Sequence, residues 1–306
     1  MRAAVVHDFG QVPVVGEFPD PQAGDGELVV DVALAGLNPV DRLRLAGYEY
    51  LNVSLPFVAG REGVGRVGDR RVYFPAAVEP YGSFATRALV SAADVLDVPD
   101  GLSDEMTVPL GIAGLSGWLP LTYDTQLSGG ERVLVTGATG MVGQVATQAA
   151  KLLGAGHVVA AGRHVKTLES LLDRGADEIV VLGDDPHAEI GAVAGDGFDV
   201  VVDCVFGEPF AAALGCTAPG GRVVVVGLTA GTEVTLKFFS LYQCRVISHD
   251  LTTTPVAEKQ RALNAMADHA IAGRLRLTSE RYPLEGIAEA WAELTRGAHR
   301  KLMIAP

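Results

Sequence analysis

Three glycines at positions 137, 140 and 143 follow an apolar segment, Val133–Thr136, and precede a helix-forming run that ends at Gly154. This spacing allows a tight turn, a close approach of backbone N–H groups to a pyrophosphate, and close packing of the helix on the strand. A second apolar segment, His157–Ala161, completes the required context. The pattern predicts a dinucleotide site, and glycines that serve only as structural turns are the alternative. The expected pyrophosphate contacts are Gly137, Thr139, Gly140, Met141, Val142 and Gly143.

The residues after the second apolar segment indicate which dinucleotide binds. An NAD site usually has an Asp or Glu about 20 residues beyond the glycines, where it binds the ribose 2′-hydroxyl. Here Arg163 and His164 occupy that place, Lys166 follows, and no carboxylate occurs before Glu169. A guanidinium binds a 2′-phosphate through paired charge-assisted hydrogen bonds. Arg163 and Lys166 therefore favour NADPH, and a solvated arginine at a helix start is the alternative.

The composition is that of a soluble globular protein. The 306 residues are 48% hydrophobic and 20% charged, which excludes a mainly disordered chain and suffices for two domains. The formal charge of −13 argues against nucleic-acid and anionic-membrane partners. We find no signal-peptide pattern, no bilayer-spanning apolar run, and no metal or disulfide framework among three separated cysteines. We therefore expect a cytoplasmic protein.

From residue 131 onward, short valine-rich strands alternate with helices, which predicts an α/β fold with a parallel, doubly wound sheet. The expected strands are Arg132–Thr136, His157–Ala161, Glu178–Leu182, Asp199–Cys204, Arg222–Gly227 and Arg245–His249. The expected helices include Lys166–Arg174, Glu208–Cys216, Glu258–Gly273 and Glu285–Arg296, and a short strand, Leu302–Ala305, closes the chain. The first 115 residues differ, because Pro and Gly interrupt their strands, and they predict an antiparallel, barrel-like domain.

These segments, taken in order, resemble the medium-chain dehydrogenase/reductase superfamily, most closely its zinc-free quinone oxidoreductase and enoyl reductase branch. DGELVVDVALAGLNPVDRLRLAG is similar to the family's early strand and N-P-x-D helix start, and AGREGVGRVGDRRVY to its glycine-rich hairpin. PLGIAGLSGWLPL, the glycine motif, VVVVGLTAG and the terminal HRKLMIAP follow in the family's order. The resemblance implies a GroES-like catalytic domain, residues 1–116 and 256–306, with a Rossmann NADPH-binding domain, residues 117–255, inserted in it.

The resemblance also bears on metals. The family's zinc enzymes have a Cys where this chain has Asn38, and a His where it has Arg61. Amide and guanidinium groups are poor zinc ligands, so we expect no metal. Without zinc, the implied substrate is already a good hydride acceptor, a quinone or an activated C=C bond, and the cofactor supplies the hydride. The stretch from Gly60 to Tyr73 is shorter than in relatives, so substrate size cannot be carried over.

Further site residues follow from the same resemblance, each with an ordinary structural alternative. Asn38 is implied at the nicotinamide ribose, although Asn38 and Asp41 also suit a helix N-terminus. Lys301 is implied near the cofactor, but a terminal lysine is commonly solvated. Ser116 is implied beside the nicotinamide, and helix-terminus serine is its alternative. The backbone of Gly227, Leu228 and Thr229 is expected to approach the nicotinamide from the end of the fifth strand.

Two tyrosines and one arginine are the candidates for contact with substrate. Tyr48 or Tyr50 could polarise a substrate oxygen and donate a proton, and a packed surface tyrosine is the alternative for each. Arg61 could hold an anionic group or a semi-reduced quinone oxygen, or pair with Glu62.

The sequence therefore predicts an NADPH-dependent reductase of quinones or α,β-unsaturated carbonyls. A trans-enoyl thioester reductase and a non-catalytic NADPH-binding protein with a structural or sensor role remain alternatives. The last strand of the predicted sheet, around Cys244–His249, is an edge that carries Arg245 and His249. Because relatives dimerise through this strand, we expect a homodimer.

Overall fold

A computed structural model of the chain describes residues 1–48, 53–242 and 244–306. The chain divides into two compact units. Unit 1 comprises residues 1–112, 255–271 and 277–306, and unit 2 comprises residues 113–254 and 272–276. The first passage from one unit to the other lies in a helical stretch made of η2 (Leu110–Gly114), α3 (Leu115–Leu119) and η3 (Pro120–Asp124). The stretch is kinked at Gly111, whose ψ of −125° is not helical.

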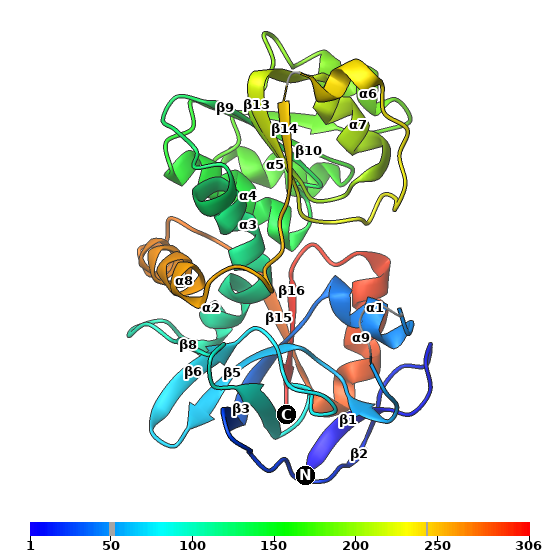
Figure 1. Cartoon of the computed structure of the whole chain (residues 1–306), viewed down its shortest axis with the longest axis vertical. Helices are drawn as coiled ribbons and strands as arrows, with labels where there is room; N and C mark the ends of the chain where they lie inside the picture. Colours follow the sequence, from blue (N-terminus) through cyan, green and yellow to red (C-terminus); the bar gives the residue numbers. More distant parts are fainter. Residues whose placement is uncertain (49–52, 243) are drawn as a thin grey trace. The chain divides into compact units, whose positions relative to one another are not determined.

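Unit 2 is built on a parallel sheet with the strand order β11-β10-β9-β12-β13-β14. Figure 1 labels β9, β10, β13 and β14 of this sheet. Its strands are β9 (Arg132–Thr136), β10 (His157–Gly162), β11 (Glu178–Val181), β12 (Phe198–Asp203), β13 (Thr217–Val225) and β14 (Cys244–Ser248). The central strands β9, β10 and β12 are buried except for one residue near the start of each, as strands covered on both faces should be. The order reverses direction between β9 and β12, so the carboxyl ends of these strands flank the expected ligand crevice. The predicted doubly wound sheet is confirmed.

Helices cover this sheet in two groups. Helix α4 (Met141–Leu152) packs against α3 and α5 (Val165–Leu172), whereas α6 (Pro186–Gly191) packs against α7 (Gly207–Gly215). Right-handed crossovers place the two groups on opposite faces, because the strand order runs in opposite directions from β9.

The fifth strand differs from its prediction at both ends. We expect Arg222–Gly227 from the sequence, but β13 begins at Thr217 and ends at Val225. Its first half contains Pro219 and two glycines, a composition typical of turns. The structure accommodates them in an irregular strand whose register against β12 shifts.

Unit 1 contains two sheets. One has the order β2-β1-β4, and the other has the order β15-β16-β3-β5-β6-β8, with β7 paired to β3. The strands are β1 (Arg2–Val6), β2 (Val14–Glu17), β3 (Glu27–Leu37), β4 (Phe57–Val58), β5 (Glu62–Val67), β6 (Arg70–Phe74), β7 (Arg87–Ser91), β8 (Leu96–Asp97), β15 (Ser279–Pro283) and β16 (Lys301–Ala305). The long strand β3 organises the larger sheet, because β5, β7 and β16 all pair with it antiparallel. The C-terminal strand is therefore part of the N-terminal fold.

The helices of unit 1 complete its core. They are α1 (Pro39–Leu45), α2 (Asp104–Pro109), α8 (Val256–Ile271), η5 (Leu284–Gly286) and α9 (Ile287–Arg296). Helix α9 buries Ile287, Ala290 and Trp291, whose spacing puts them on one face, against Leu302 and Ile304 of β16. No helix in the described ranges is long and apolar enough to cross a membrane.

The hairpin of β5 and β6 is short. Val67 pairs with Arg70, so only Gly68 and Asp69 form the turn, and Gly68 has a φ of +58°. A two-residue turn with positive φ at its first position favours glycine there. This turn explains how the segment from Gly60 to Tyr73 closes in few residues.

Candidate active site and cofactor site

The glycine loop, residues 137–143, joins the end of β9 to the start of α4. Gly140 is the N-cap of α4, and a side chain on Gly143 would collide with the carbonyl of Gly137. Only glycine therefore lets the helix begin directly on the loop. The first N–H groups of an α-helix, here those of Met141 and Val142, have no intrahelical acceptors and are suited to bind an anion.

Two cations follow the carboxyl end of β10. Gly162 lies against the glycine loop, because a Cβ placed on it would be 2.9 Å from Cγ2 of Thr139. Arg163 and Lys166 come directly after this contact, and both are exposed. Within the described ranges, no carboxylate forms an ion pair with either side chain. His164 begins α5 and its Nδ1 accepts the N–H of Thr167 at 3.3 Å. The structure thus places two cations next to the glycine loop.

The strand-end loop, residues 226–231, follows β13. The loop contains the predicted residues Gly227, Leu228 and Thr229. We expect these residues at the end of the fifth strand, but β13 already ends at Val225. A side chain on Gly227 would collide with the carbonyl of Cys204, so the loop packs closely on the residue after β12. Leu228 and Thr229 are exposed.

Ser116 lies in α3 and is buried. A Cβ on the next residue, Gly117, would be 2.7 Å from the carbonyl oxygen of Val142, so α3 packs on the first turn of α4. Ser116 therefore belongs to the same unit as the glycine loop, Arg163 and the strand-end loop.

Unit 1 contains a buried polar cluster made of Asn38, Glu62, Tyr73 and Lys301. The Lys301 ammonium forms an ion pair with the Glu62 carboxylate and donates to Oδ1 of Asn38 at 2.6 Å. Asn38 Nδ2 donates to Glu62 Oε1 at 2.8 Å, and the Tyr73 hydroxyl donates to Glu62 Oε2 at 2.6 Å. The backbone N–H of Ile112 also donates to that oxygen at 2.6 Å.

The cluster fixes the charges of its members. Burial alone would raise the pKa of Glu62, but the Lys301 charge and the N–H and O–H donors outweigh it, so this pKa lies below its usual value. Burial and the adjacent Glu62 charge raise the pKa of Tyr73 well above its usual value. Glu62 is therefore an anion, and Tyr73 is a neutral phenol that donates to it.

The cluster changes the interpretation of two predicted residues. Lys301 is 2% exposed, so the solvated alternative is wrong for it. Asn38 donates from its amide nitrogen to both Glu62 and the carbonyl of Gly36, which uses both of its N–H groups. Only the second lone pair of its Oδ1 could serve a ligand.

Asp41 has the helix-start role that its position favours. Its Oδ2 accepts the backbone N–H of Asn38 at 2.8 Å, and Pro39 follows as the first residue of α1. Burial raises the pKa of Asp41 to about 6, against the opposing charge of Arg44 and the Asn38 hydrogen bond. Arg44 itself pairs with Glu79 and donates to the carbonyl of Gly60.

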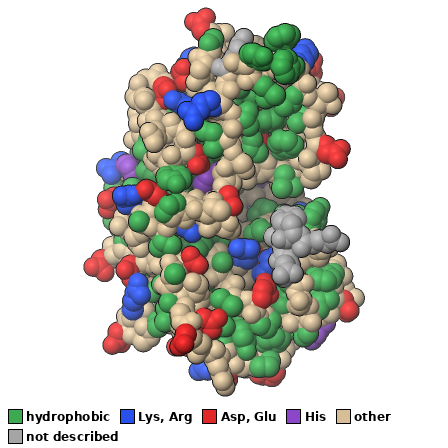
Figure 2. All heavy atoms as spheres, in the orientation of Figure 1, with side chains coloured by type: hydrophobic (Ala, Val, Ile, Leu, Met, Phe, Trp, Pro, Cys, Tyr) green, Lys and Arg blue, Asp and Glu red, His purple; other side chains and the backbone are tan. Residues whose placement is uncertain are grey.

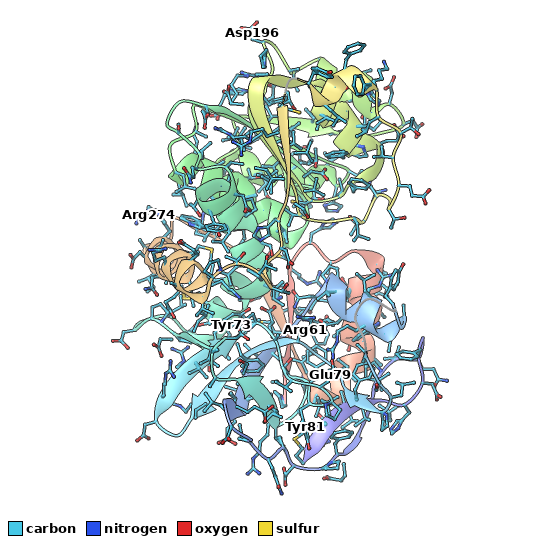
Figure 3. All side chains as sticks on the ribbon, viewed as in Figure 1. Arg61, Tyr73, Glu79, Tyr81, Asp196 and Arg274 are labelled. Carbon is cyan, nitrogen blue, oxygen red and sulfur yellow. The ribbon has the colours of Figure 1, made fainter. Side chains whose placement is uncertain are left out.

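Arg61 precedes β5 and is half-buried (Figure 3). Its positive charge opposes the effect of burial, which raises the pKa values of Asp41 and Tyr73. Glu62 pairs with Lys301 instead, and the predicted alternative of an Arg61–Glu62 pair is wrong. No ion pair to Arg61 occurs in the part of the chain that the structure describes.

Of the two predicted proton donors, the structure describes Tyr48. Tyr48 follows α1 and is 46% exposed, with its backbone N–H bonded to the carbonyl of Leu43 at 3.3 Å. Tyr50 lies outside the described residues.

Sequence reasoning missed the centre of the cluster. The sequence suggests Glu62 only as a possible partner of Arg61, and it gives no reason to place Tyr73 in a site. The Lys301–Glu62 contact spans 239 positions of the chain and the Tyr73–Glu62 contact spans 11. No local sequence pattern encodes either contact. In the described ranges, no three His, Cys, Asp or Glu side chains are grouped to hold a metal ion.

Comparison with known proteins places this architecture in a family. Residues 142–268 match the family described as "Zinc-binding dehydrogenase". The structure of a quinone oxidoreductase from Thermus thermophilus, solved also with NADPH, is 30% identical, covers 100% of both chains and superposes with a TM-score of 0.80. The chain belongs to the medium-chain dehydrogenase/reductase superfamily, in its quinone oxidoreductase-like branch.

Two further proteins show the breadth of the similarity. Human quinone oxidoreductase is 26% identical over 97% of this chain and 95% of its own length. Prostaglandin reductase-3 from Bos taurus is 33% identical over 71% of this chain and 59% of its own length.

Proposed function

We propose that the protein is an NADPH-dependent oxidoreductase that reduces a quinone or an α,β-unsaturated carbonyl compound. The main support for NADPH binding is the glycine loop together with two exposed cations, Arg163 and Lys166, that follow the strand beside it. Membership in the quinone oxidoreductase-like branch supports the proposal, as does the name of a related reductase, prostaglandin reductase-3. NADPH would supply the hydride, and the protein would bind, orient and shield the reactants.

The residues of unit 2 are assigned to the cofactor. The glycine loop suits a pyrophosphate, because glycine keeps the space beside the first turn of α4 free for backbone N–H donors. Arg163 and Lys166 are assigned to the 2′-phosphate, since a carboxylate at this place would instead favour NADH. We assign Ser116 and the strand-end loop to the nicotinamide half.

The residues of unit 1 are assigned to substrate and nicotinamide ribose. Lys301 and Glu62 hold the Asn38 amide in one orientation, with one oxygen lone pair left for a hydroxyl donor. Arg61 is assigned to a substrate oxygen that gains negative charge. A zinc ion does not suit this donor set, because Asn38 and Arg61 are poor ligands and two cations lie close by. Tyr48 or Tyr50 is the proposed proton donor.

We also propose a cytoplasmic homodimer that forms through β14. This strand pairs only with β13 among the described strands, and its residues Arg245 and Val246 are exposed. Hydrophobic side chains gather on the surface of unit 2 (Figure 2). In the segment that precedes β14, Phe238, Phe239 and Tyr242 are 66–76% exposed. His249, expected on this edge, is instead turned inward, with its Nδ1 2.7 Å from Asp124.

The test is a pair of titrations of the purified protein with NADPH and NADH. We expect NADPH to bind at least tenfold more tightly, a difference of about 1.4 kcal/mol. Arg163→Ala should remove this preference by weakening NADPH alone. Arg174→Ala, which removes another arginine shortly after α5, is the matched control and should change neither affinity. Turnover of quinones and enones by the protein with Tyr48→Phe and Tyr50→Phe then tests the donor role.

The outcomes separate the parts of the proposal. Equal affinity for both dinucleotides would remove Arg163 from the site but keep a dinucleotide-binding protein. Absence of binding to either would refute the oxidoreductase function. Tight NADPH binding without turnover of any acceptor would favour the non-catalytic alternative.

A further inference from the structure

Thr136 and Asp203 are the last residues of β9 and β12, the two neighbouring strands at which the order of the unit 2 sheet reverses. Asp203 is fully buried, and its carboxylate accepts a hydrogen bond from the Thr136 hydroxyl. No cation of the described chain pairs with this carboxylate. A buried carboxylate without a countercharge is costly to fold, and here it stands where doubly wound sheets bind ligands.

The carboxylate organises the chain that follows it, residues 203–207, which we call the Asp203 turn. Asp203 Oδ2 accepts the backbone N–H of Phe206 at 2.8 Å. The backbone of Phe206 has φ 58° and ψ −160°, a conformation that is normally restricted to glycine. Such a conformation persists only where its surroundings impose it. The Asp203 hydrogen bond and the stacking of Phe206 on Phe210, with ring centroids 5.0 Å apart, are those surroundings.

The Asp203 turn lies between the two loops that are assigned to the cofactor. On one side, a Cβ on Gly137 would be 2.5 Å from Cγ1 of Val205, so the turn touches the glycine loop. On the other side, the N–H of Ala230 donates to the carbonyl of Val205 at 2.8 Å, and Gly227 packs on Cys204. The N–H of Val226 also donates to the carbonyl of Asp203 at 2.7 Å. Any movement of the turn would therefore change the distance between the loops.

We infer that Asp203 is a positioning residue that sets the spacing between the glycine loop and the strand-end loop, and thereby the affinity for the dinucleotide that spans them. This inference rests on the proposed NADPH function, which assigns both loops to one cofactor. Asp203 acts through hydrogen bonds to Thr136 and Phe206 and not through contact with the cofactor. An amide at this position would still accept the N–H of Phe206, so the role depends on the acceptor oxygen more than on the charge.

The experiment compares the two ends of β12. Asp203→Ala removes the acceptor at the carboxyl end. Asp199→Ala is the matched control, because Asp199 Oδ2 accepts the N–H of Arg132 at 2.8 Å at the opposite ends of the same two strands. We expect Asp203→Ala to weaken NADPH binding at least tenfold, Asp203→Asn to restore affinity to within about threefold, and Asp199→Ala to leave it within about twofold.

Hydrogen exchange of the unliganded proteins provides a second measurement that does not require NADPH. Amides of residues 137–143 and 226–231 should exchange faster in Asp203→Ala and should not change in Asp199→Ala. A merely structural role would raise exchange across the whole sheet equally. If Asp203→Ala does not fold, both measurements are made on Thr136→Val instead. This substitution keeps the shape of a strand residue and removes the hydroxyl that donates to Asp203.

The results decide two questions separately. If the unsubstituted protein binds NADPH and Asp203→Ala binds it equally well, the inference is wrong and the proposed function stands. If the unsubstituted protein binds neither NADPH nor NADH, the proposed function is wrong, and exchange alone decides the positioning role. Unchanged exchange in both loops overturns that role, and faster exchange confined to them supports it. Failure of Asp203→Asn to restore affinity would overturn the claim that the acceptor oxygen is what matters.

Discussion

Replacement of Lys301 by methionine should destabilise unit 1 strongly. Methionine keeps most of the length of the side chain but leaves the Glu62 carboxylate buried without its cation, because Glu62 is fully buried and Lys301 is 2% exposed. Removal of one partner of a buried ion pair costs about 3–5 kcal/mol. The remaining donors to Glu62, from Tyr73, Asn38 and Ile112, are neutral and cannot replace the charge.

The two tryptophans allow this loss to be measured in one unit. Trp291 lies in the core of unit 1 and Trp118 in unit 2. Urea unfolding followed by fluorescence in a Trp118→Phe background therefore reports on unit 1 alone. Arg281→Met is the control, since its pair with Glu105 is exposed and should contribute less than about 1 kcal/mol.

The pH dependence distinguishes an ion pair from simple packing. In the unsubstituted protein the pKa of Glu62 is lowered, so its stabilising effect is present above its unfolded pKa and is lost as the pH falls through the folded value. In Lys301→Met, burial without a cation should raise this pKa, so the variant should regain stability on acidification. Addition of Glu62→Gln should recover part of the loss, with a coupling of about 1–3 kcal/mol. A loss below about 1 kcal/mol with an unchanged pH profile would refute this account of the cluster.

Three further predictions concern other groups. Burial raises the pKa values of Asp41 and Asp203 to about 6. As the pH falls, both groups therefore bind protons in the folded state at a higher pH than in the unfolded state. Lowering the pH from 7.5 to 5.5 should then stabilise the protein by roughly 1–2 kcal/mol, and urea unfolding of the Asp41→Asn, Asp203→Asn protein should lack this gain. Because Phe206 has a positive φ, Phe206→Gly should be about 1–2 kcal/mol more stable than Phe206→Ala by the same method, and the reverse order would show that the turn is unstrained. Phe239→Asp should convert the proposed dimer to a monomer in light scattering with NADPH affinity intact, and a mass unaffected by the substitution would exclude this patch from the interface.

Local sequence patterns predicted the sheet of unit 2 well. Each strand there is a short apolar run bounded by glycine or polar residues, and burial on both faces makes that run the dominant signal. The prediction was wrong at β13, where Pro219 and Gly220 indicate a turn but tertiary pairing with β12 imposes an irregular strand. The glycine loop was predictable for the same reason as the strands, because its residues are adjacent in sequence.

The polar cluster of unit 1 was not predictable in this way. Asn38 and Lys301 are 263 positions apart, and β16 meets β3 only after the whole of unit 2 has been traversed. A lysine near the end of a chain is usually solvated, and its burial here follows from pairing between distant strands. The same applies to Glu62, whose neighbour in sequence, Arg61, is not its partner in space.

Two of the buried carboxylates, Glu62 and Asp203, differ in the groups that surround them. Glu62 is paired with the Lys301 cation and has a lowered pKa, as expected for a stabilising buried ion pair. Removal of Lys301 should therefore mainly lower the free energy of unfolding. Asp203 has only neutral donors and a raised pKa, so its charge is a burden to folding. Its carboxylate holds the Asp203 turn where the strand order reverses, between the two loops assigned to the cofactor, which favours a role in ligand affinity. Substitution of Lys301 should therefore change unfolding more than ligand affinity, and substitution of Asp203 should do the opposite.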